Sequence, residues 1–386
     1  MSEWQKVKLG EVCEISAGGD RPQIFSNHRT DKCRIPIYSN GIDNEGLYGF
    51  TDTPKNNGNA ITITGRGANA GTVFYRKDPF LSIIRLLTLT PNSEIINAKY
   101  LFYLLKNKTF LSTGSAQPQI TVPNISQFEI EFNPDIETQH RVATILSRYD
   151  SLIENYQKQI KLLEEAAQRL YKEWFVDLHF PGHENTKIID GVPEGWEKKK
   201  LCEFTGITDG THDSPKQVEI GLPLVTGRCI VDGSIDFSQA YNISEEDVIK
   251  INKRSAVEDG DILLSNIGTI GKVCRISKSG NYAVKNMIIF KPHDAIHSCF
   301  LHRFLTDNNT QMDFLQQAAG TSQKFVSLSF IRNTLILRPS DTILNLFYNH
   351  SEKYFNYVQT LQSQLRLLTE ARDRLLPKLM SGEIEI

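Results

Sequence analysis

The chain has 386 residues, more than one ordinary hydrophobic core contains, and its length therefore predicts two domains. Its 40% hydrophobic and 23% charged residues are typical of a folded globular protein and exclude a disordered chain. The 43 basic and 45 acidic residues give a net charge of −2, which neither requires nor excludes a nucleic-acid partner, because an average can hide a local basic face.

The sequence carries no signal for export or membrane insertion. No apolar run approaches the roughly 20 residues that a membrane-spanning helix needs, and the opening MSEWQKVKLG lacks a signal-peptide core. The six cysteines form no C-x-x-C pair and stand mostly in apolar, strand-like stretches, which favours buried, reduced thiols. We therefore expect a cytoplasmic protein with no membrane partner.

Residues 1–139 are expected to form a first globular module. Short strand-like runs alternate with glycine-rich turns, an internal helix is predicted around residues 97–110, and a strand pair closes the module. This mixture indicates an α+β domain with mostly antiparallel sheets. The segment TGRGANAG, residues 64–71, is followed by the strand-like TVFYR, whereas a dinucleotide site needs a helix there. We interpret this segment as the tip of a β-hairpin.

A long amphipathic helix is predicted in residues 140–178. Its apolar residues recur at alternating spacings of three and four, which is typical of the narrow seam of a coiled coil rather than the wider face of a core-packed helix. The predicted seam residues are Leu146, Tyr149, Ile153, Tyr156, Ile160, Leu163 and Leu170. Such a seam must be covered by another apolar surface.

Residues 179–195 are rich in proline and glycine and are predicted to be a linker, and after them the sequence repeats itself. GWEKKKLCEF at 195–204 corresponds to the opening EWQKVKLGEV, and GDILLSNIGTIGKVCRI at 260–276 corresponds to NAITITGRGANAGTVFY at 59–75. The matching segments keep their order. We infer a tandem duplication in which residues 196–341 form a second module, with its internal helix around 296–317.

The second copy also ends with a long helix, predicted in residues 342–386. The predicted seam residues of this helix are Tyr354, Val358, Leu361, Leu365, Leu368 and Leu375. Ser351 and Arg372 interrupt its apolar stripe, and Pro377 is expected to end the regular helix near Arg374, because the residue before a proline avoids helical dihedral angles. We expect the two helices to pair within the chain; packing of each on its own module is the alternative. Periodicity alone does not choose between parallel and antiparallel pairing.

No catalytic site and no metal site is predicted. His293 and His297 have helical spacing but lack the glutamate that follows the first histidine of a zinc-binding H-E-x-x-H helix. Glu197 begins an acidic-x-Lys element like those of many nucleases, yet it has no evident carboxylate partner, and metal-dependent cleavage needs carboxylates held close together. GTIGKV at 268–273 lacks both the spacing and the Ser/Thr of a phosphate-binding loop.

Polar, glycine-rich hairpin tips occur at equivalent places in the two modules. Arginine and lysine pair with guanine edges or phosphates, asparagine and glutamine pair with adenine edges, and glycine lets the backbone approach DNA. The candidate DNA-binding residues are Arg66, Asn69, Gln117 and Gln119 in the first module and Arg228, Asn266, Thr269, Lys272, Gln323 and Lys324 in the second. The tips stay polar while their residues differ, as one scaffold that recognises two different half-sites requires. The alternative is that they are solvated turns with no partner.

Several further segments occur in a characteristic order. W-x-x-x-x-L opens both modules at Trp4–Leu9 and Trp196–Leu201, the linker contains FPGHEN and DGVPEGW, the first helix ends in LYKEWFVD, and the C-terminal helix ends in RLLPKLMSGEI. With these motifs the sequence resembles, over essentially its whole length, the DNA-recognition (specificity) subunit of type I restriction–modification systems.

The resemblance implies two target-recognition domains, each contacting one half of a bipartite, asymmetric site in double-stranded DNA. It implies that the two helices form an antiparallel coiled coil that sets the spacer and docks methyltransferase subunits, two of which are expected. The chain itself would be non-catalytic and would direct adenine methylation and cleavage by its partners. It would bind no cofactor, because S-adenosylmethionine belongs to the methyltransferase subunits, and ATP and magnesium are expected on partners such as restriction/translocase subunits.

Two other classes of function stay open from the residues alone. One is a stand-alone metal-dependent nuclease that uses Glu197, and the other is a coiled-coil scaffold with two protein-interaction modules.

Overall fold

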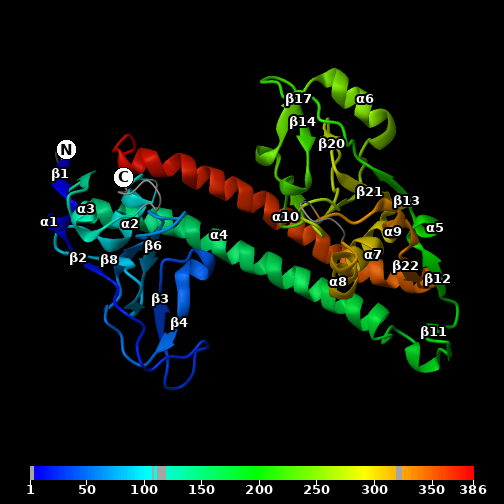
Figure 1. The fold of residues 1–386 in the computed structure, drawn as a ribbon, viewed down its shortest axis with the longest axis horizontal. Helices are drawn as coiled ribbons and strands as arrows, with labels where there is room; N and C mark the ends of the chain where they lie inside the picture. Colours follow the sequence, from blue (N-terminus) through cyan, green and yellow to red (C-terminus); the bar gives the residue numbers. More distant parts are fainter. Residues whose placement is uncertain (1–3, 107, 111–118, 319–323) are drawn as a thin grey trace. The chain divides into compact units, whose positions relative to one another are not determined.

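The structure is a computed structural model that describes residues 4–106, 108–110, 119–318 and 324–386. The chain divides into two compact units: unit 1 is Met1–Asn155 with Leu365–Ile386, and unit 2 is Tyr156–Gln364. Each unit holds one globular module and segments of two long helices, α4 (Ile136–Tyr171) and α10 (Asp341–Met380) (Figure 1).

The module of unit 1 is built on two small sheets. The four-stranded sheet is antiparallel and has the order β2-β8-β5-β6, whereas the three-stranded sheet β4-β3-β7 includes the parallel pair β3 and β7. The pair β1-β9 joins the first and last strands. The strands are β1 (Gln5–Lys8), β2 (Cys13–Ala17), β3 (Ile35–Tyr38), β4 (Leu47–Thr51), β5 (Ala60–Ile63), β6 (Val73–Arg76), β7 (Leu81–Ser82), β8 (Leu87–Pro91) and β9 (Glu129–Phe132). The helices are α1 (Leu9–Val12), η1 (Asp43–Gly46), α2 (Ala98–Leu105) and α3 (Val122–Ser126).

The module of unit 2 repeats this plan. Its antiparallel four-stranded sheet has the order β13-β21-β18-β19, its three-stranded sheet β17-β14-β20 again contains one parallel pair, and β12 pairs with β22. The strands are β12 (Glu197–Lys200), β13 (Gly206–Asp209), β14 (Leu222–Val225), β15 (Ile230–Val231), β16 (Ser234–Ile235), β17 (Tyr241–Ile243), β18 (Ile262–Ser265), β19 (Val273–Arg275), β20 (Ala283–Val284), β21 (Met287–Lys291) and β22 (Leu335–Arg338). The helices are α5 (Leu201–Phe204), η4 (Gly227–Cys229), η5 (Phe237–Gln239), α6 (Glu245–Ser255), α7 (Ala295–Thr306), α8 (Asn308–Gln316) and α9 (Leu328–Asn333). The predicted α+β duplication is therefore confirmed.

In each unit the central strands are buried because a helix covers the sheet. In unit 1, Ile61 and Leu89 of the sheet belong to one core with Leu101 of α2, and all three are fully buried. In unit 2, Leu264 and Phe290 share a core with the residues of α7. Short apolar runs such as AITI therefore form strands with both faces covered, rather than half-exposed strands of alternating polarity.

The internal helices differ from their predicted extents. The helix of unit 1 ends at Leu105, and that of unit 2 is two helices, α7 and α8, separated at Asp307. Asp307 has an extended backbone, and its carboxylate accepts a hydrogen bond from the amide of Asn309, 3.0 Å away. The prediction of one continuous helix around 296–317 is wrong, because this N-cap offers the backbone a partner outside the helix.

The two long helices pack together, and they are antiparallel. Within unit 1, Leu376 and Leu379 of α10 share a core with Val142 and Leu146 of α4. Within unit 2, Phe347 near the start of α10 contacts Trp174, which follows α4, with ring centroids 5.9 Å apart. The start of one helix thus meets the end of the other in each unit.

The predicted seam positions are all removed from solvent to some degree. Leu146, Ile153, Ile160, Val358 and Leu361 are buried, and Tyr149, Tyr156, Leu163, Leu170, Tyr354, Leu365, Leu368 and Leu375 are half-buried. Of the two polar interruptions, Ser351 is fully buried, and Arg372 bonds Asp150 of α4, with Nη1 to Oδ1 2.8 Å. Arg372 therefore supplies an ion pair where the stripe lacks an apolar residue.

Pro377 does not end the helix. α10 continues to Met380 with Pro377 inside it, so the prediction of an end near Arg374 is wrong. A proline in a helix interior costs about 3 kcal/mol. Here Leu376 and Leu379, 6% and 3% exposed, lie in the core of unit 1, and burial of two such side chains, about 1.5–3 kcal/mol each, offsets that cost.

The segment between the modules has structure of its own, and one cysteine differs from expectation. A π-helical turn (Lys172–Val176) follows α4, then a 3-10 turn, η3 (His183–Asn185), and a two-stranded hairpin of β10 (Ile188–Ile189) and β11 (Val192–Pro193). Five cysteines are buried, but Cys202 on α5 is exposed, so the expectation of buried thiols is wrong there. Its helix presents Leu201 and Phe204 to the core and Cys202 to solvent.

Candidate nucleic-acid interface

Most of the predicted DNA-binding loops lie at one end of each four-stranded sheet, along the edge that the ends of its strands form. In unit 1, the pairs Ala17↔Leu87, Ile63↔Leu87 and Ile63↔Val73 place the end of β2, the start of β8, the end of β5 and the start of β6 side by side. Antiparallel neighbours whose ends align send their connecting turns out of the same edge. We call this edge, with the turns at residues 18–19, 64–72 and 83–86, the loop edge of unit 1.

Unit 2 has the same edge. The pairs Asp209↔Ile288, Ser265↔Met287 and Leu264↔Val273 align the corresponding strand ends. The turns that leave this edge lie at residues 210–212, 266–272 and 285–286, and we call them the loop edge of unit 2.

In unit 1, Arg66 and Gln119 lie opposite each other. They form an isolated antiparallel bridge, and the amide of Ile120 donates to the carbonyl of Gly65 over 2.9 Å. Asn69 lies on the same hairpin tip, where its carbonyl accepts hydrogen bonds from the hydroxyls of Thr64 and Thr72. The side chains of Arg66 and Asn69 are exposed, and Gln119 is half-buried. The predicted hairpin at 64–71 is confirmed, and it holds three of the four candidates of this module close together.

In unit 2 the equivalent loops meet through two backbone bonds, the first of which corresponds to the bond between Ile120 and Gly65. Val326 N donates to Asn266 O, and Gly268 N donates to Lys324 O, each over 2.9 Å. Thr269 and Lys324 are exposed there, and Arg228 is exposed on η4, where its neighbour Gly227 approaches Ser265 closely.

Two candidate residues of unit 2 make hydrogen bonds to the backbone of their own module. The buried side-chain amide of Asn266 donates to Val326 O over 3.0 Å, and the half-buried Lys272 donates from Nζ to Ile230 O over 2.8 Å. Both therefore hold loops in place. Gln117 and Gln323 lie outside the described residues.

The loop edges also contain residues that the sequence patterns did not single out. In unit 1 they are Ile84 and Arg85, both exposed, and in unit 2 they are His212, Lys285 and Asn286. His212 lies between two oxygens, with Nε2 2.7 Å from Asp209 Oδ2 and Nδ1 3.0 Å from Asn286 Oδ1. A signal was present in the sequence, because IIRLL and VKNMI each place a basic residue within an apolar run directly before a central strand.

Unit 2 also contains an open groove of about 470 Å³ beside its loop edge. Its walls are the face of α6 that carries Lys250 and Arg254 and the segment 211–215, and Figure 1 shows α6 next to the three-stranded sheet. In unit 1, only residues 52–59 separate β4 from β5, and no helix is described there. The second module therefore presents a surface that the first one lacks.

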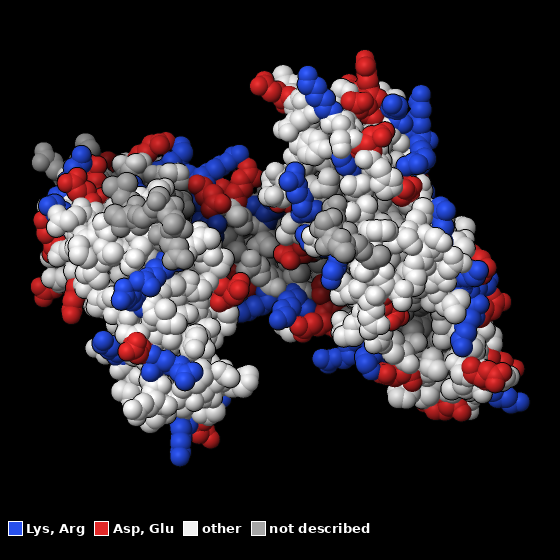
Figure 2. Space-filling view, viewed as in Figure 1, with Lys and Arg blue, Asp and Glu red and all other residues white. Residues whose placement is uncertain are grey.

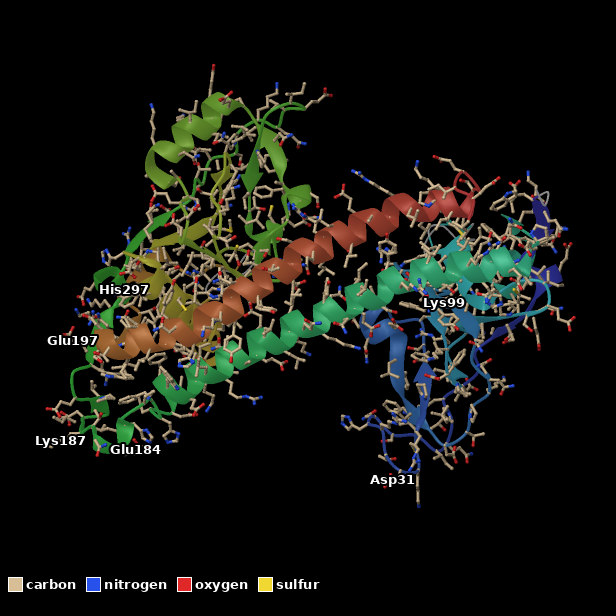
Figure 3. All side chains as sticks on the ribbon, turned by 180° about the vertical axis from the view of Figure 1, so that it is seen from behind. Asp31, Lys99, Glu184, Lys187, Glu197 and His297 are labelled. Carbon is tan, nitrogen blue, oxygen red and sulfur yellow. The ribbon has the colours of Figure 1, made fainter. Side chains whose placement is uncertain are left out.

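The titratable groups of interest for catalysis are dispersed. Glu197 on β12 is exposed, and its hydrogen bond with Lys199, 2.7 Å away, lowers the pKa of the carboxyl. His297 is on α7, a different element from Glu197, and its Nδ1 is 2.8 Å from Asp294 Oδ1; Figure 3 labels both residues in unit 2. Within the described ranges no group of three or more His, Cys, Asp and Glu side chains is placed to hold a metal ion.

Charge is mixed over the surface. In Figure 2, basic and acidic side chains are interspersed over the visible face of both units. Attraction to a polyanion would therefore depend on local groups at the loop edges rather than on the field of the whole molecule.

No helix in the described parts of the chain has the length and apolar character needed to cross a membrane.

Comparison with known proteins finds similarity to one class of protein. Residues 1–165 match the family model described as the type I restriction modification DNA specificity domain. The chain is 28% identical over 348 residues to the type I restriction enzyme MjaIX specificity subunit of Methanocaldococcus jannaschii, covering 84% of this chain and 78% of that protein. It is 25% identical over 408 aligned positions to the MjaVIII specificity subunit of the same organism, covering 100% and 93%.

A solved structure shows the same fold. The crystal structure of the type I restriction–modification system S subunit from M. genitalium matches with a TM-score of 0.68 at 17% identity, covering 98% of this chain and 96% of that one. The fold that the resemblance implies is thereby confirmed. Residues 1–165 thus carry a type I restriction modification DNA specificity domain, and the chain as a whole is similar to the specificity subunits of type I restriction–modification systems.

Proposed function

We propose that this chain recognises a bipartite, asymmetric site in double-stranded DNA, with each loop edge contacting one half. The observation that carries the proposal is the pair of loop edges. Both are held by the same backbone bond, from Ile120 N to Gly65 O in one module and from Val326 N to Asn266 O in the other. The bridged residues differ, being Arg66 with Gln119 in unit 1 and Ile267 with Phe325 in unit 2. One frame with different side chains suits recognition of two different half-sequences.

The proposed DNA-contacting residues are those predicted from the hairpin tips. Exposed Arg66, Arg228 and Lys324 are suited to phosphates and guanine edges, and Asn69 and Gln119 are suited to adenine edges. Thr269 adds a hydroxyl that can bond either. Asn266 and Lys272 support the loops from within, and Gln117 and Gln323 belong to the same proposed set.

We further propose that methyltransferase subunits, two in number, dock on the helix pair, and that restriction/translocase subunits join the complex. Large apolar side chains on the helices are exposed in both units: Leu152 and Leu367 in unit 1 are 45% and 59% exposed, and Leu162 and Tyr357 in unit 2 are both 64% exposed. In this proposal the docked subunits cover these side chains.

In this proposal the chain is non-catalytic and binds no cofactor. S-adenosylmethionine, ATP and magnesium would act on the partner subunits, which carry out adenine methylation and cleavage. A nuclease centred on Glu197 has less support, since that carboxylate is paired with Lys199 and, among the residues that the structure describes, no group of three or more His, Cys, Asp and Glu side chains is placed to hold a metal ion.

Exchange of one module tests the proposal. The module of residues 1–139 is replaced by the corresponding module of a relative, the chimera is expressed with the methyltransferase subunits, and the methylated sites of the host DNA are sequenced. We expect one half of the methylated sequence to change while the other half and the modified base type persist. The matched control replaces residues 196–341 and should change the other half. An unaltered methylation pattern in both chimeras would refute DNA recognition by the modules.

A further inference from the structure

The turn before β8 has an unusual backbone. Ile84 and Arg85 have φ angles of +53° and +58°, in the left-handed region that L-residues with side chains rarely adopt. For isoleucine the conformation is especially unfavourable, because its branched Cβ crowds the backbone. Strained backbone of this kind persists only where the surroundings impose it, and it clusters at functional sites.

The surroundings of this turn do impose it. Ile84 N donates to Gly19 O over 2.7 Å and Arg85 N donates to Gly18 O over 2.9 Å, while the amide of Asn40 donates to Ile84 O over 2.5 Å. The other side-chain atom of Asn40, Oδ1, accepts from Gly65 N over 2.8 Å and so ties the turn to the hairpin tip.

Two glycines make room for the turn. A Cβ on Gly18 would lie 2.7 Å from Ile83 N, and a Cβ on Gly65 would lie 3.2 Å from Arg85 O. Both approaches are closer than ordinary packing allows. The strained turn is therefore clamped between the other two turns of the loop edge.

The clamped residues point away from the core. Ile83 and Leu86 are fully buried, whereas Ile84 between them is 50% exposed and Arg85 is exposed. The core gains little from Ile84, and asparagine or glycine would adopt its backbone at lower cost. A branched apolar side chain held outward next to an arginine is explained if both contact a partner at this edge.

Unit 2 has the corresponding turn with other side chains. Asn286 has a φ of +54°, and its backbone N–H donates to Thr211 O over 3.1 Å. The side-chain oxygen of Asn286 is hydrogen-bonded with His212. The neighbouring Lys285 donates from Nζ to Ser214 Oγ over 2.6 Å. Here the left-handed residue is one that tolerates this backbone and carries an amide.

We infer that these turns are base-contacting elements of the two modules, an inference that rests on the proposed function. Ile84 contacts a thymine methyl group and Arg85 a guanine edge in the first half-site, while Asn286 contacts an adenine edge in the second. The hydrogen bonds that hold each turn fix the direction of its side chains before DNA binds.

The test uses the full chain with its methyltransferase subunits and two variants, Ile84→Gly and Ile84→Asn. Both residues adopt positive φ readily, so the thermal midpoint should stay the same or rise. Discrimination at one or two base pairs of the first half-site should fall about tenfold or more, measured as methylation of matched and mismatched duplexes. Ile24→Gly is the matched control, since Ile24 is 52% exposed in the same module but outside the loop edge, and it should leave discrimination unchanged.

Two further variants test which half-site each turn contacts. Arg85→Gln should relax the first half-site, with the exposed Arg34→Gln as its control, and Asn286→Gly should relax the second half-site only. If the wild-type complex methylates a defined site and every turn variant keeps its full discrimination, the inference is overturned while the proposed function stands. If the wild-type complex shows no preferred sequence, the proposed function itself fails.

Discussion

The internal helices of the two modules both donate a hydrogen bond to a carboxylate of α4, but they do so with different side chains. Tyr103 of α2 and Arg303 of α7 stand at corresponding positions of KYLFYLL and CFLHRFL, and both are almost fully buried against α4. Tyr103 donates its hydroxyl to Asp150 Oδ2 over 2.7 Å, whereas Arg303 donates from Nη1 to Glu164 Oε2 over 2.5 Å.

The arginine that pairs with the α4 carboxylate comes from a different element in each unit. In unit 1 it is Arg372 of α10, which bonds the same Asp150, and in unit 2 it is Arg303 of the module itself. The apolar positions next to them, Leu101 with Leu301 and Leu105 with Leu305, are alike and fully buried. The duplication therefore kept the core and replaced the polar contacts, so each module has its own junction with its helix segments.

The largest expected effect is at the junction of unit 2. Arg303→Ala removes a side chain that is 2% exposed and leaves Glu164 without its partner, whereas the backbone carbonyl of residue 303, which accepts from Gln168, is retained. Breaking a buried ion pair from one side costs about 3–5 kcal/mol, and because the Glu164 side chain is 40% exposed we expect about 3 kcal/mol. Urea unfolding monitored by tryptophan fluorescence measures the loss.

Arg169→Ala is the matched control for that variant. Arg169 is exposed on the same stretch of α4, so its removal should change the free energy of unfolding by less than about 0.5 kcal/mol. Equal losses for the two variants would show that the junction contributes nothing beyond surface charge.

A smaller effect is expected at the junction of unit 1. Asp150→Ala leaves the Tyr103 hydroxyl and Arg372 without their shared acceptor, which should cost about 1–3 kcal/mol, and Tyr103→Phe, which removes one hydrogen bond, should cost about 1 kcal/mol. In a double-mutant cycle with Arg372→Ala, the Asp150 loss should shrink, because the two residues share one interaction. Strict additivity would refute the coupling.

The larger features of this fold were predictable because each has a repeated or periodic pattern in the sequence. Repeated motifs indicate the duplication, and the spacing of residues such as Leu146 and Ile153 predicts a covered helical stripe. The points at which helices end or continue were not predictable in the same way. At Asp307 a side-chain cap competes with the helix, and at Pro377 burial of the neighbouring leucines outweighs the preference of proline.

The candidate site was predictable only in part. Sequence equivalence located the hairpin tips, but strand pairing decides that the tip with Arg66 and the turn with Arg85 share an edge. Composition also could not distinguish an exposed lysine such as Lys324 from Lys272, whose ammonium group bonds a carbonyl of its own module. The left-handed backbone at Ile84 could not be predicted even though IIRLL marks the turn, since a β-branched residue such as isoleucine rarely adopts that conformation.

The smallest expected effect is a difference between the modules in how their stability depends on pH. His302 is fully buried, and burial, followed by the nearby charges of Arg303 and Arg275, lowers its pKa well below the ordinary value of 6.5. Its counterpart in the first module is Phe102, which cannot titrate. Because the folded pKa of His302 is lowered, the unfolded chain binds a proton that the folded chain refuses as pH falls below about 6.5, so acid destabilises unit 2 through this residue.

His302→Phe should therefore remove part of the acid sensitivity without changing its sign. Between pH 7.5 and pH 5.5 the wild-type chain should lose about 1 kcal/mol more stability than the variant, since each unit of pH below the unfolded pKa contributes up to about 1.4 kcal/mol until the folded pKa is reached. Urea midpoints at the two pH values measure the difference, and Phe102→His in unit 1 is the reciprocal variant, with Phe102 half-buried. If wild type and His302→Phe lose the same stability on acidification, His302 is not held neutral in the folded chain.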